Sequence, residues 1–246
     1  MSLATPASVR KLQRALYAKA KANPSYRFYA LYDKIYRKDM LLWAWSCCRA
    51  NGGSSGVDGQ SFAGIEARGV EAWLDQLGKE LKEKSYRPQA VRRVRIPKPD
   101  GKQRPLGIPT IEDRVAQMAA VLVLAAIFEA DLTSEQYAYR PQRSAHDALR
   151  EVHGLLNRGY TEVVDADLSS YFDTIPHQEL MKSVARRVSD GAMLALIKSW
   201  LEMAVEEDDG KGNKRRTTVN KDSGGGTPQG APMTPRTQKI TSNLGG

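Results

Sequence analysis

The chain has 246 residues, of which 41% are apolar and 26% charged, a composition typical of a globular protein and not of a disordered or collagenous one. The length corresponds to about one or two domains. The formal net charge of +9 is uneven, because residues 1–104 carry 21 basic and 9 acidic side chains whereas residues 105–246 carry 16 and 19. The first part is therefore suited to bind a polyanion, and the second is not.

Three features argue against membrane insertion, secretion and zinc binding. The longest apolar run, residues 115–128, is shorter than the roughly 20 residues of a membrane span and predicts a buried helix. The basic N-terminus has no apolar stretch of the kind found in secretion signals. Cys47 and Cys48 are adjacent, which disfavours a disulfide, so we expect a reducing, cytoplasmic environment, and the three scattered histidines give no zinc spacing.

In chain order, the first elements are predicted to be helices followed by a hairpin. Residues 8–50 show a helical pattern, a Gly/Ser loop follows at residues 51–56, and residues 61–84 are helical again. Residues 90–108 alternate basic and apolar side chains around a Pro-Asp-Gly-Lys turn, which predicts a hairpin. Thr110 with Asp113 then gives a helix-start signal ahead of the apolar run.

The second half is predicted to mix helices with short strands. Residues 144–158 form a helix that starts at Ser144, and residues 161–168 form a strand. Helices follow at residues 176–188 and 192–201. A second hairpin contains the acidic stretch Glu206–Asp209, which we interpret as a solvated loop, and the chain continues into the glycine-rich residues 224–230. The expected fold class is α+β.

The predicted strand at residues 161–168 carries the strongest chemical signal. Alternation along a strand directs Val164, Ala166 and Leu168 toward a core and Asp165 and Asp167 to the opposite face. Two carboxylates on one buried face need a cation, and hard oxygen ligands suit Mg²⁺. The alternative is that both acids are solvated at a sheet edge or cap the next helix.

Two further stretches favour contacts with phosphates and nucleotides. Residues 84–104 contain eight basic side chains and one acid, so one face of the hairpin is suited to phosphate groups. The alternative is an edge strand protected by charge. The glycines of residues 224–230 allow close approach of a backbone to a ligand, and Gln229 can hydrogen-bond a base or a sugar, although a plain connection has the same composition.

Together these stretches resemble the group II intron type of reverse transcriptase, over about residues 50–235. The resemblance is carried by five blocks, Ser54-Ser-Gly-Val-Asp-Gly59, residues 95–109 with Asp113-Arg114, Tyr139-Arg-Pro-Gln-Arg-Ser-Ala-His-Asp147, residues 164–173 and Gly226-Thr-Pro-Gln-Gly230. It implies a right-hand polymerase fold: a basic helical extension at residues 1–60, fingers at 61–160, a partial palm at 161–235 and a divergent tail at 236–246.

The resemblance also implies a metal site and its chemistry. Asp167 matches the family's metal-binding aspartate, and the backbone carbonyl of Leu168 matches a second ligand. Asp165 stands where the family varies, so no metal role is transferred to it. Two Mg²⁺ ions are expected in an intact enzyme, which copies an RNA template by adding deoxynucleoside triphosphates to a DNA or RNA primer.

Other matched positions imply contacts with nucleotide and RNA. Lys98 and Arg104 match residues that hold the triphosphate, Phe172 matches the aromatic residue that packs on the nucleotide sugar, and Gln229 matches the loop glutamine. The RNA-binding candidates are Arg92, Arg93 and Arg95 of the basic hairpin, together with Arg140 and Arg143 of the block at residues 139–147.

The sequence also departs from the family pattern. Family members carry Tyr-x-Asp-Asp on a later hairpin, and these 246 residues contain no such motif. After Pro235 the chain is polar and ends in glycines where the family continues with an apolar helix. We therefore expect a C-terminally truncated copy that is inactive alone. Two alternatives remain open: an RNA-binding splicing module without polymerase activity, which could bind intron RNA, and a host-defence reverse transcriptase. The oligomeric state is not predicted.

Overall fold

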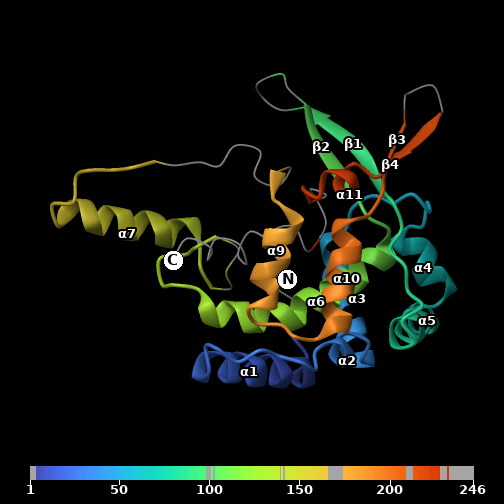
Figure 1. Ribbon diagram of the computed structural model, residues 1–246, viewed down its shortest axis with the longest axis horizontal. Helices are drawn as coiled ribbons and strands as arrows, with labels where there is room; N and C mark the ends of the chain where they lie inside the picture. The colour runs from blue at the N-terminus through green and yellow to red at the C-terminus, as the bar shows by residue number, and fades with distance from the viewer. Residues whose placement is uncertain are drawn as a thin grey trace.

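The computed structural model describes residues 4–97, 101, 103–138, 140, 142–165, 174–208, 213–227 and 232 (Figure 1). A helical body carries a small sheet at one end, and one helix stands apart from both. The helices are α1 (Ala7–Ala22), α2 (Tyr32–Ile35), α3 (Lys38–Asn51), α4 (Phe62–Arg68), α5 (Val70–Lys82), α6 (Ile111–Phe128), the 3₁₀ turn η1 (Glu129–Asp131), α7 (Ala145–Asn157), α9 (His177–Ala185), α10 (Gly191–Leu201) and α11 (Val219–Ser223).

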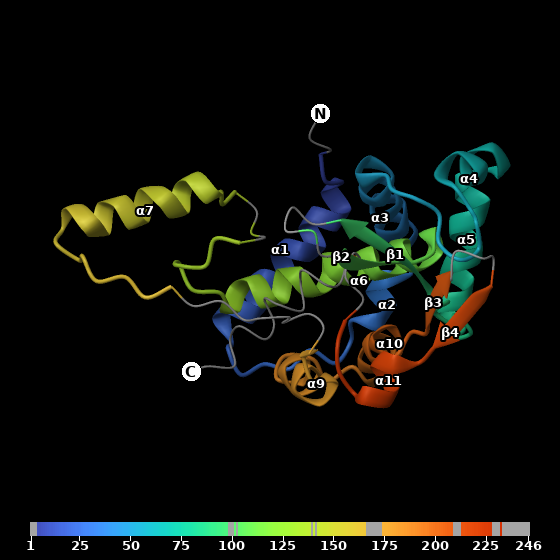
Figure 2. The same ribbon diagram turned by 90° about the horizontal axis from the view of Figure 1, so that it is seen from above.

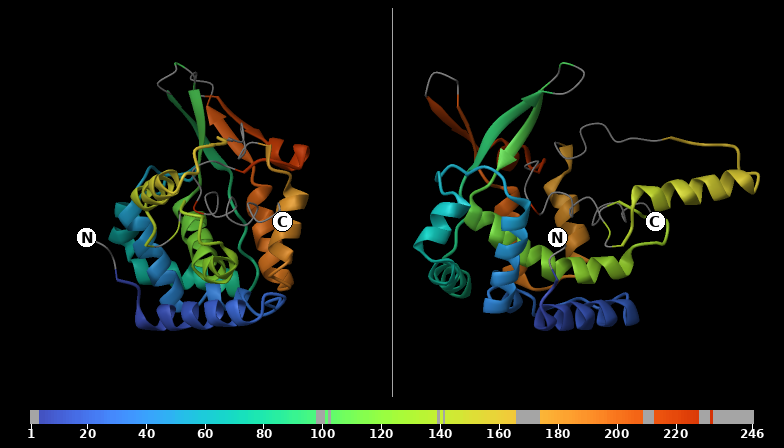
Figure 3. Two further views of the ribbon diagram at one scale, coloured as in Figure 1. Left: turned by 90° about the vertical axis from the view of Figure 1, so that its left-hand side faces the viewer. Right: turned by 180° about the vertical axis from the view of Figure 1, so that it is seen from behind.

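Helix α6 forms the centre of the body, as the apolar run predicted. It begins at Thr110, whose hydroxyl accepts a hydrogen bond from the Asp113 backbone N–H at 3.1 Å. Helices α1, α2 and α3 pack against it (Figures 1 and 3). Most of its side chains are buried, because neighbours cover it on several sides. In the described part of the chain, no helix is long and apolar enough to span a membrane.

The two predicted hairpins are confirmed, and they join into one sheet. The strands are β1 (Val91–Pro97), β2 (Gln103–Ile108), β3 (Val205–Asp208) and β4 (Lys214–Thr217). Their order is β2-β1-β3-β4, with antiparallel pairs inside each hairpin and a parallel pair between β1 and β3. The hairpins point away from the helical body (Figure 3). Neither hairpin's local pattern predicted this parallel pairing.

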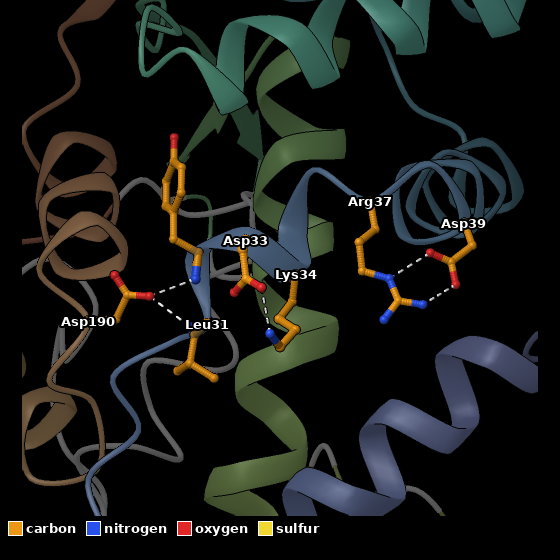
Figure 4. A network of polar contacts seen from close by, with 7 residues as sticks. Leu31, Asp33, Lys34, Arg37, Asp39 and Asp190 are labelled. Carbon is orange, nitrogen blue, oxygen red and sulfur yellow. Dashed lines mark hydrogen bonds and ion pairs between the residues drawn. The ribbon is translucent and has the colours of Figure 1, made fainter.

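One carboxylate connects the N-terminal helices to the second half of the chain. Asp190 accepts hydrogen bonds from the Leu31 and Tyr32 backbone N–H groups at 2.7 and 2.8 Å (Figure 4). It also accepts hydrogen bonds from the Ala192 and Met193 backbone N–H groups at 3.0 and 3.1 Å. Burial disfavours its charged form, yet these four bonds outweigh burial and lower the pKa of Asp190. One side chain thus caps α10 and holds the chain at the start of α2.

A buried arginine makes a second connection between the same regions. The Arg187 guanidinium donates to the Ala20 carbonyl at 2.8 Å and to the Asn23 carbonyl at 3.1 Å, at the C-terminus of α1. Its Nε lies 3.2 Å from a carboxylate oxygen of Asp131. A cation is favourable at this end of a helix, so Arg187 fixes α1 against η1 and the turn after α9.

Helix α7 projects from the body, unlike the other long helices (Figure 2). None of its side chains is buried, and Leu149, Val152 and Leu156 are 64%, 49% and 43% exposed. Its N-terminus carries a complete capping box between Ser144 and Asp147, at the helix start that the sequence predicted.

The strand predicted at residues 161–168 is wrong over its described part. Residues 161–165 are irregular, and Val164, expected in a core, is 93% exposed. A strand needs a hydrogen-bonded neighbour, and no described strand lies beside this segment. The alternating pattern therefore predicted a strand, but the described part of the chain provides no neighbouring strand for it.

Candidate nucleic-acid interface

Strand β1 carries basic side chains that the sequence predicted to bind RNA. Two of them, Arg92 and Arg95, already form hydrogen bonds with other parts of the protein. The Arg95 guanidinium donates to Glu207 of β3 at 2.6 Å, in a pair that is largely exposed. Arg92, which points to the other face, donates to the Ser55 carbonyl through Nε at 3.1 Å and Nη2 at 2.8 Å. Exposed ion pairs contribute little stability, so Arg95 can exchange Glu207 for a phosphate at small cost.

The acidic stretch of the second hairpin is not the solvated loop that we expected. Residues 206–208 belong to β3, and Glu206 is only 6% exposed. Arg216 donates to its carboxylate at 2.8 Å and Lys214 lies 3.3 Å from it, and the Arg216 hydrogen bond lowers the pKa of Glu206. The local sequence suggested a polar turn. Glu206 is buried where β3 pairs with β1, and a local pattern does not reveal this long-range contact.

The arginines of the second fingers block, Arg140 and Arg143, lie between α6 and α7 and differ in exposure and in their hydrogen bonds within the protein. Arg140 is mostly buried: its Nε donates to Glu129 at 2.8 Å and its Nη1 to the Thr133 and Gln136 carbonyls. Arg143 is exposed and lies over the Tyr137 ring, 5.2 Å from its centroid. Arg143 is therefore the one of these two that an external phosphate can reach without breaking internal bonds.

The exposed side of α1 is also strongly basic. Arg10, Lys11 and Arg14 lie on it with Tyr17, which is 41% exposed. The first acid of the sequence is Asp33, so no carboxylate of α1 itself competes for these cations. A cationic helix face with an exposed aromatic ring is suited to phosphates and bases.

The glycine-rich segment lies against the end of the segment that carries the predicted catalytic aspartate. Gly225 forms an antiparallel bridge with Pro176, the Gly226 N–H donates to the Ile175 carbonyl at 3.0 Å, and the His177 N–H donates to the Gly224 carbonyl at 2.8 Å. A Cβ on Gly225 would lie 3.4 Å from the Ile175 oxygen, so the approach is close. Residues 175–177 and 224–226, about fifty residues apart in the sequence, are therefore brought together.

Most of the predicted nucleotide and metal residues fall outside the described part of the chain. This holds for Asp167, Leu168, Phe172, Lys98 and Gln229. Arg104 lies in β2 opposite Ile96, but its side chain is likewise not described. Arg93 is half-buried in β1.

The described residues do not fit a metal ion. Asp165 is exposed in an irregular segment, and no group of three or more His, Cys, Asp or Glu side chains in the described ranges could hold a cation. No reaction step through Mg²⁺ is therefore derived from this structure.

Sequence reasoning identified Asp113 by its helix-start signal with Thr110 and the Asp113-Arg114 pair by resemblance, and the structure shows what the pair contacts. The buried Asp113 carboxylate accepts hydrogen bonds from the Tyr86 hydroxyl at 2.5 Å, the Thr110 hydroxyl at 2.7 Å and the Gln89 N–H at 3.2 Å. Burial is the main cause that raises the pKa of Asp113. Asp113 therefore holds Tyr86 and Gln89, which precede β1, against the start of α6.

Arg114 and Arg92 together fix the loop that precedes α4. Arg114 donates to the carbonyls of Pro109, Gly52 and Ser54, beside the Ser55 carbonyl that Arg92 contacts. Carbonyl oxygens that face a guanidinium are satisfied acceptors, so this loop is positioned by Arg92 of β1 and by Arg114 of the first fingers block. The Ser54–Gly59 block and this block, separate in sequence, are thus neighbours in space.

Comparison with known proteins agrees with this arrangement. A family model described as "Reverse transcriptase (RNA-dependent DNA polymerase)" matches residues 96–243. Protein YkfC of Escherichia coli (strain K12) is 35% identical over 241 residues, which cover 96% of this chain and 61% of that protein. The group II intron-encoded protein LtrA of Lactococcus lactis subsp. cremoris is 32% identical over 184 residues, which cover 74% of this chain and 30% of that protein.

A solved structure supports the fold. The partial Cas6-RT-Cas1–Cas2 complex contains a chain with a TM-score of 0.53 and 20% identity, over 87% of this chain and 34% of that chain. At this identity the likeness shows the fold alone. The present chain is shorter than each of these proteins and spans only part of them.

Proposed function

Because this chain belongs to the reverse transcriptase family and is related to group II intron-encoded proteins, we propose that it forms the fingers and part of the palm of an RNA-directed DNA polymerase. In this division, residues 1–60 are a basic extension, 61–160 the fingers, 161–235 the partial palm and 236–246 a divergent tail. The bound partners are an RNA template, a DNA or RNA primer and deoxynucleoside triphosphates.

The observation that carries this proposal is the docking of residues 224–226 on residues 175–177. In the sequence, the first segment lies just before Gln229, and the second follows the stretch that holds Asp167 and Phe172. A polymerase needs its nucleotide loop next to its catalytic carboxylate, because reacting groups must be held within a few ångströms. We retain Asp167 and the Leu168 carbonyl as Mg²⁺ ligands, and Lys98, Arg104, Phe172 and Gln229 as nucleotide contacts, on the resemblance alone.

The template side of the proposal rests on exposed cations. Arg10, Lys11 and Arg14 on α1, Arg95 on β1 and Arg143 before α7 can each meet a phosphate without exposing a buried charge. Arg92 and Arg140 act on RNA indirectly, by holding the Ser55 loop and the segment after α6.

A second candidate is an RNA-binding splicing module without polymerase activity. One observation favours it: Arg10, Lys11 and Arg14 are exposed on α1, a cationic helix face that suits RNA binding and that nucleotide addition does not require. Both candidates bind RNA, so catalysis is what separates them.

RNA binding is tested by measuring the affinity of the whole chain for a structured RNA at several salt concentrations. We expect a negative log–log slope, because each neutralised phosphate contributes about 0.7 to 0.9 to it. Changing Arg10, Lys11 and Arg14 together to Gln should reduce the slope by about two. Glu207→Gln should raise affinity, since it removes a negative charge and frees Arg95.

The matched control changes Arg150 and Arg158 of α7 to Gln. These arginines are exposed on α7, which projects from the body, and they lie outside the contacts proposed for α1 and β1, so their loss should leave the slope nearly unchanged (Figure 2). A flat salt dependence of the unaltered chain, or equal effects of the two sets of variants, would contradict the proposed interface.

A further inference from the structure

A histidine side chain reinforces the contact between the glycine-rich segment and the start of α9. The Nε2 atom of His177 lies 2.7 Å from the Gly226 carbonyl oxygen, across 49 residues of sequence. His177 is half-buried, whereas Gly226 is buried. Two backbone hydrogen bonds flank this contact, from the His177 N–H to Gly224 and from the Gly226 N–H to Ile175. The imidazole bond is the one member of this set that a side-chain substitution removes.

The chemistry of the contact determines where the imidazole carries its proton. A backbone carbonyl oxygen only accepts hydrogen bonds, so Nε2 must be protonated and must donate. This holds for the neutral ring in its Nε2–H tautomer and for the charged ring alike. The imidazole therefore acts as a donor that holds, or clamps, the Gly226 carbonyl.

The backbone conformation at Gly226 explains why a hydrogen bond that holds its carbonyl group matters. Gly226 has a φ of 84°, a left-handed conformation that glycine adopts without a Cβ penalty but does not enforce. Thr227, the next residue, is only 5% exposed. Holding the Gly226 carbonyl fixes the direction in which the chain enters Thr227.

We propose that His177 is a positioning residue that holds Gly226 and Thr227 in the orientation needed by an incoming deoxynucleoside triphosphate. The proposal rests on the proposed function in one respect, namely that the loop after Gly226 meets the nucleotide. The clamp itself stands on the geometry of described residues.

The test uses the whole chain and three substitutions at position 177. Gln can place an amide nitrogen near the site of Nε2, Asn is too short to reach it, and Leu keeps volume without a donor. We expect hydrogen exchange of the Gly226 amide to be about five-fold faster in His177→Leu and His177→Asn, since one hydrogen bond of ordinary strength is lost. His177→Gln should exchange nearly as slowly as the unaltered chain.

Two further readouts separate positioning from general stability. Nitrogen-15 spectra of the imidazole should report a protonated Nε2 at neutral pH, and His153→Gln, on exposed α7, should leave Gly226 exchange unchanged. Affinity for a deoxynucleoside triphosphate should fall in His177→Leu and recover in His177→Gln.

Unchanged exchange at Gly226 in the Leu and Asn variants would overturn the proposal. So would nucleotide affinity that is equal in the Leu, Gln and unaltered proteins. If the unaltered chain binds no nucleotide while Gly226 exchange still follows the expected order, the nucleotide role is overturned together with the proposed function, and the clamp alone is upheld.

Discussion

Helices α6 and α7 begin with nearly the same local signals and end in opposite environments. In α6 the Thr110 hydroxyl accepts the Asp113 N–H at 3.1 Å, and in α7 the Ser144 hydroxyl accepts the Asp147 N–H at 3.2 Å. Helix α6 buries most of its side chains under α1, α2 and α3, whereas α7 buries none. Figure 2 shows this contrast directly, with α7 standing away from the body.

The contrast separates two causes that sequence reasoning tends to combine. Capping residues and apolar spacing determine where a helix begins and which face is apolar. Whether that face is covered depends on other elements, and in α7 Leu149 remains 64% exposed despite correct spacing. Matched substitutions in the two helices should therefore lower the free energy of unfolding by unequal amounts.

The largest difference is expected between the two aspartates at the third position of each helix. Asp113→Ala should lower the free energy of unfolding by about 4 kcal/mol, because the buried Tyr86 and Thr110 hydroxyls and the Gln89 N–H lose their acceptor. Asp147→Ala removes only an exposed cap and should cost about 1 kcal/mol. Urea unfolding of both variants measures the difference, and equal losses of unfolding free energy would contradict the expected contrast between α6 and α7.

Apolar truncation should give the next largest difference. Ile127→Ala in α6 removes a fully buried side chain and should cost about 3 kcal/mol, since a cavity remains. Leu156→Ala in α7, at 43% exposure, should change stability by less than about 0.5 kcal/mol. A large loss in the α7 variant would mean that α7 packs against another part of the chain in solution.

The smallest effect concerns pH. Burial, followed by the nearby Glu80, Asp113 and Asp58 carboxylates, raises the pKa of Glu112 on α6 from 4.5 to about 7. The neutral form is favoured in the folded protein, so this stabilisation is complete below pH 4.5 and is lost as the pH rises through about 7.

Replacing Glu112 by Gln should therefore raise the melting temperature at pH 8 and have little effect at pH 4.5. The control is Glu151→Gln on α7, an exposed residue paired with Arg158, which should leave the pH profile unchanged. Parallel profiles for the unaltered chain and Glu112→Gln would contradict the assigned burial of Glu112.

Local signals predicted the parts of the fold that depend on neighbouring residues. The Thr110 cap with the following apolar run gave α6, and the Pro99–Lys102 turn with alternating residues gave the first hairpin. Contacts between distant residues were missed. The pairing of Val91 with Val205 and the caps that Asp190 provides for two regions depend on a complete fold, and no local pattern carries that information.

The candidate site divides in the same way. The motifs around Asp167 and Gln229 were identified by resemblance, but both residues lie outside the described part of the chain. The described contacts instead identify Asp113, Arg114 and His177 as the side chains that hold neighbouring motifs together. The strand predicted at residues 161–168 was wrong over residues 161–165, since alternation alone cannot supply the partner that a strand requires.

The most direct test of the account is primer extension on an RNA template with Mg²⁺. The account predicts that the purified 246-residue chain binds the template and primer but adds no nucleotides, because it lacks the Tyr-x-Asp-Asp carboxylates of its family. Adding a separate segment that carries this hairpin should produce extension, and Asp167→Ala should abolish it. Processive extension by the 246-residue chain alone would contradict the account.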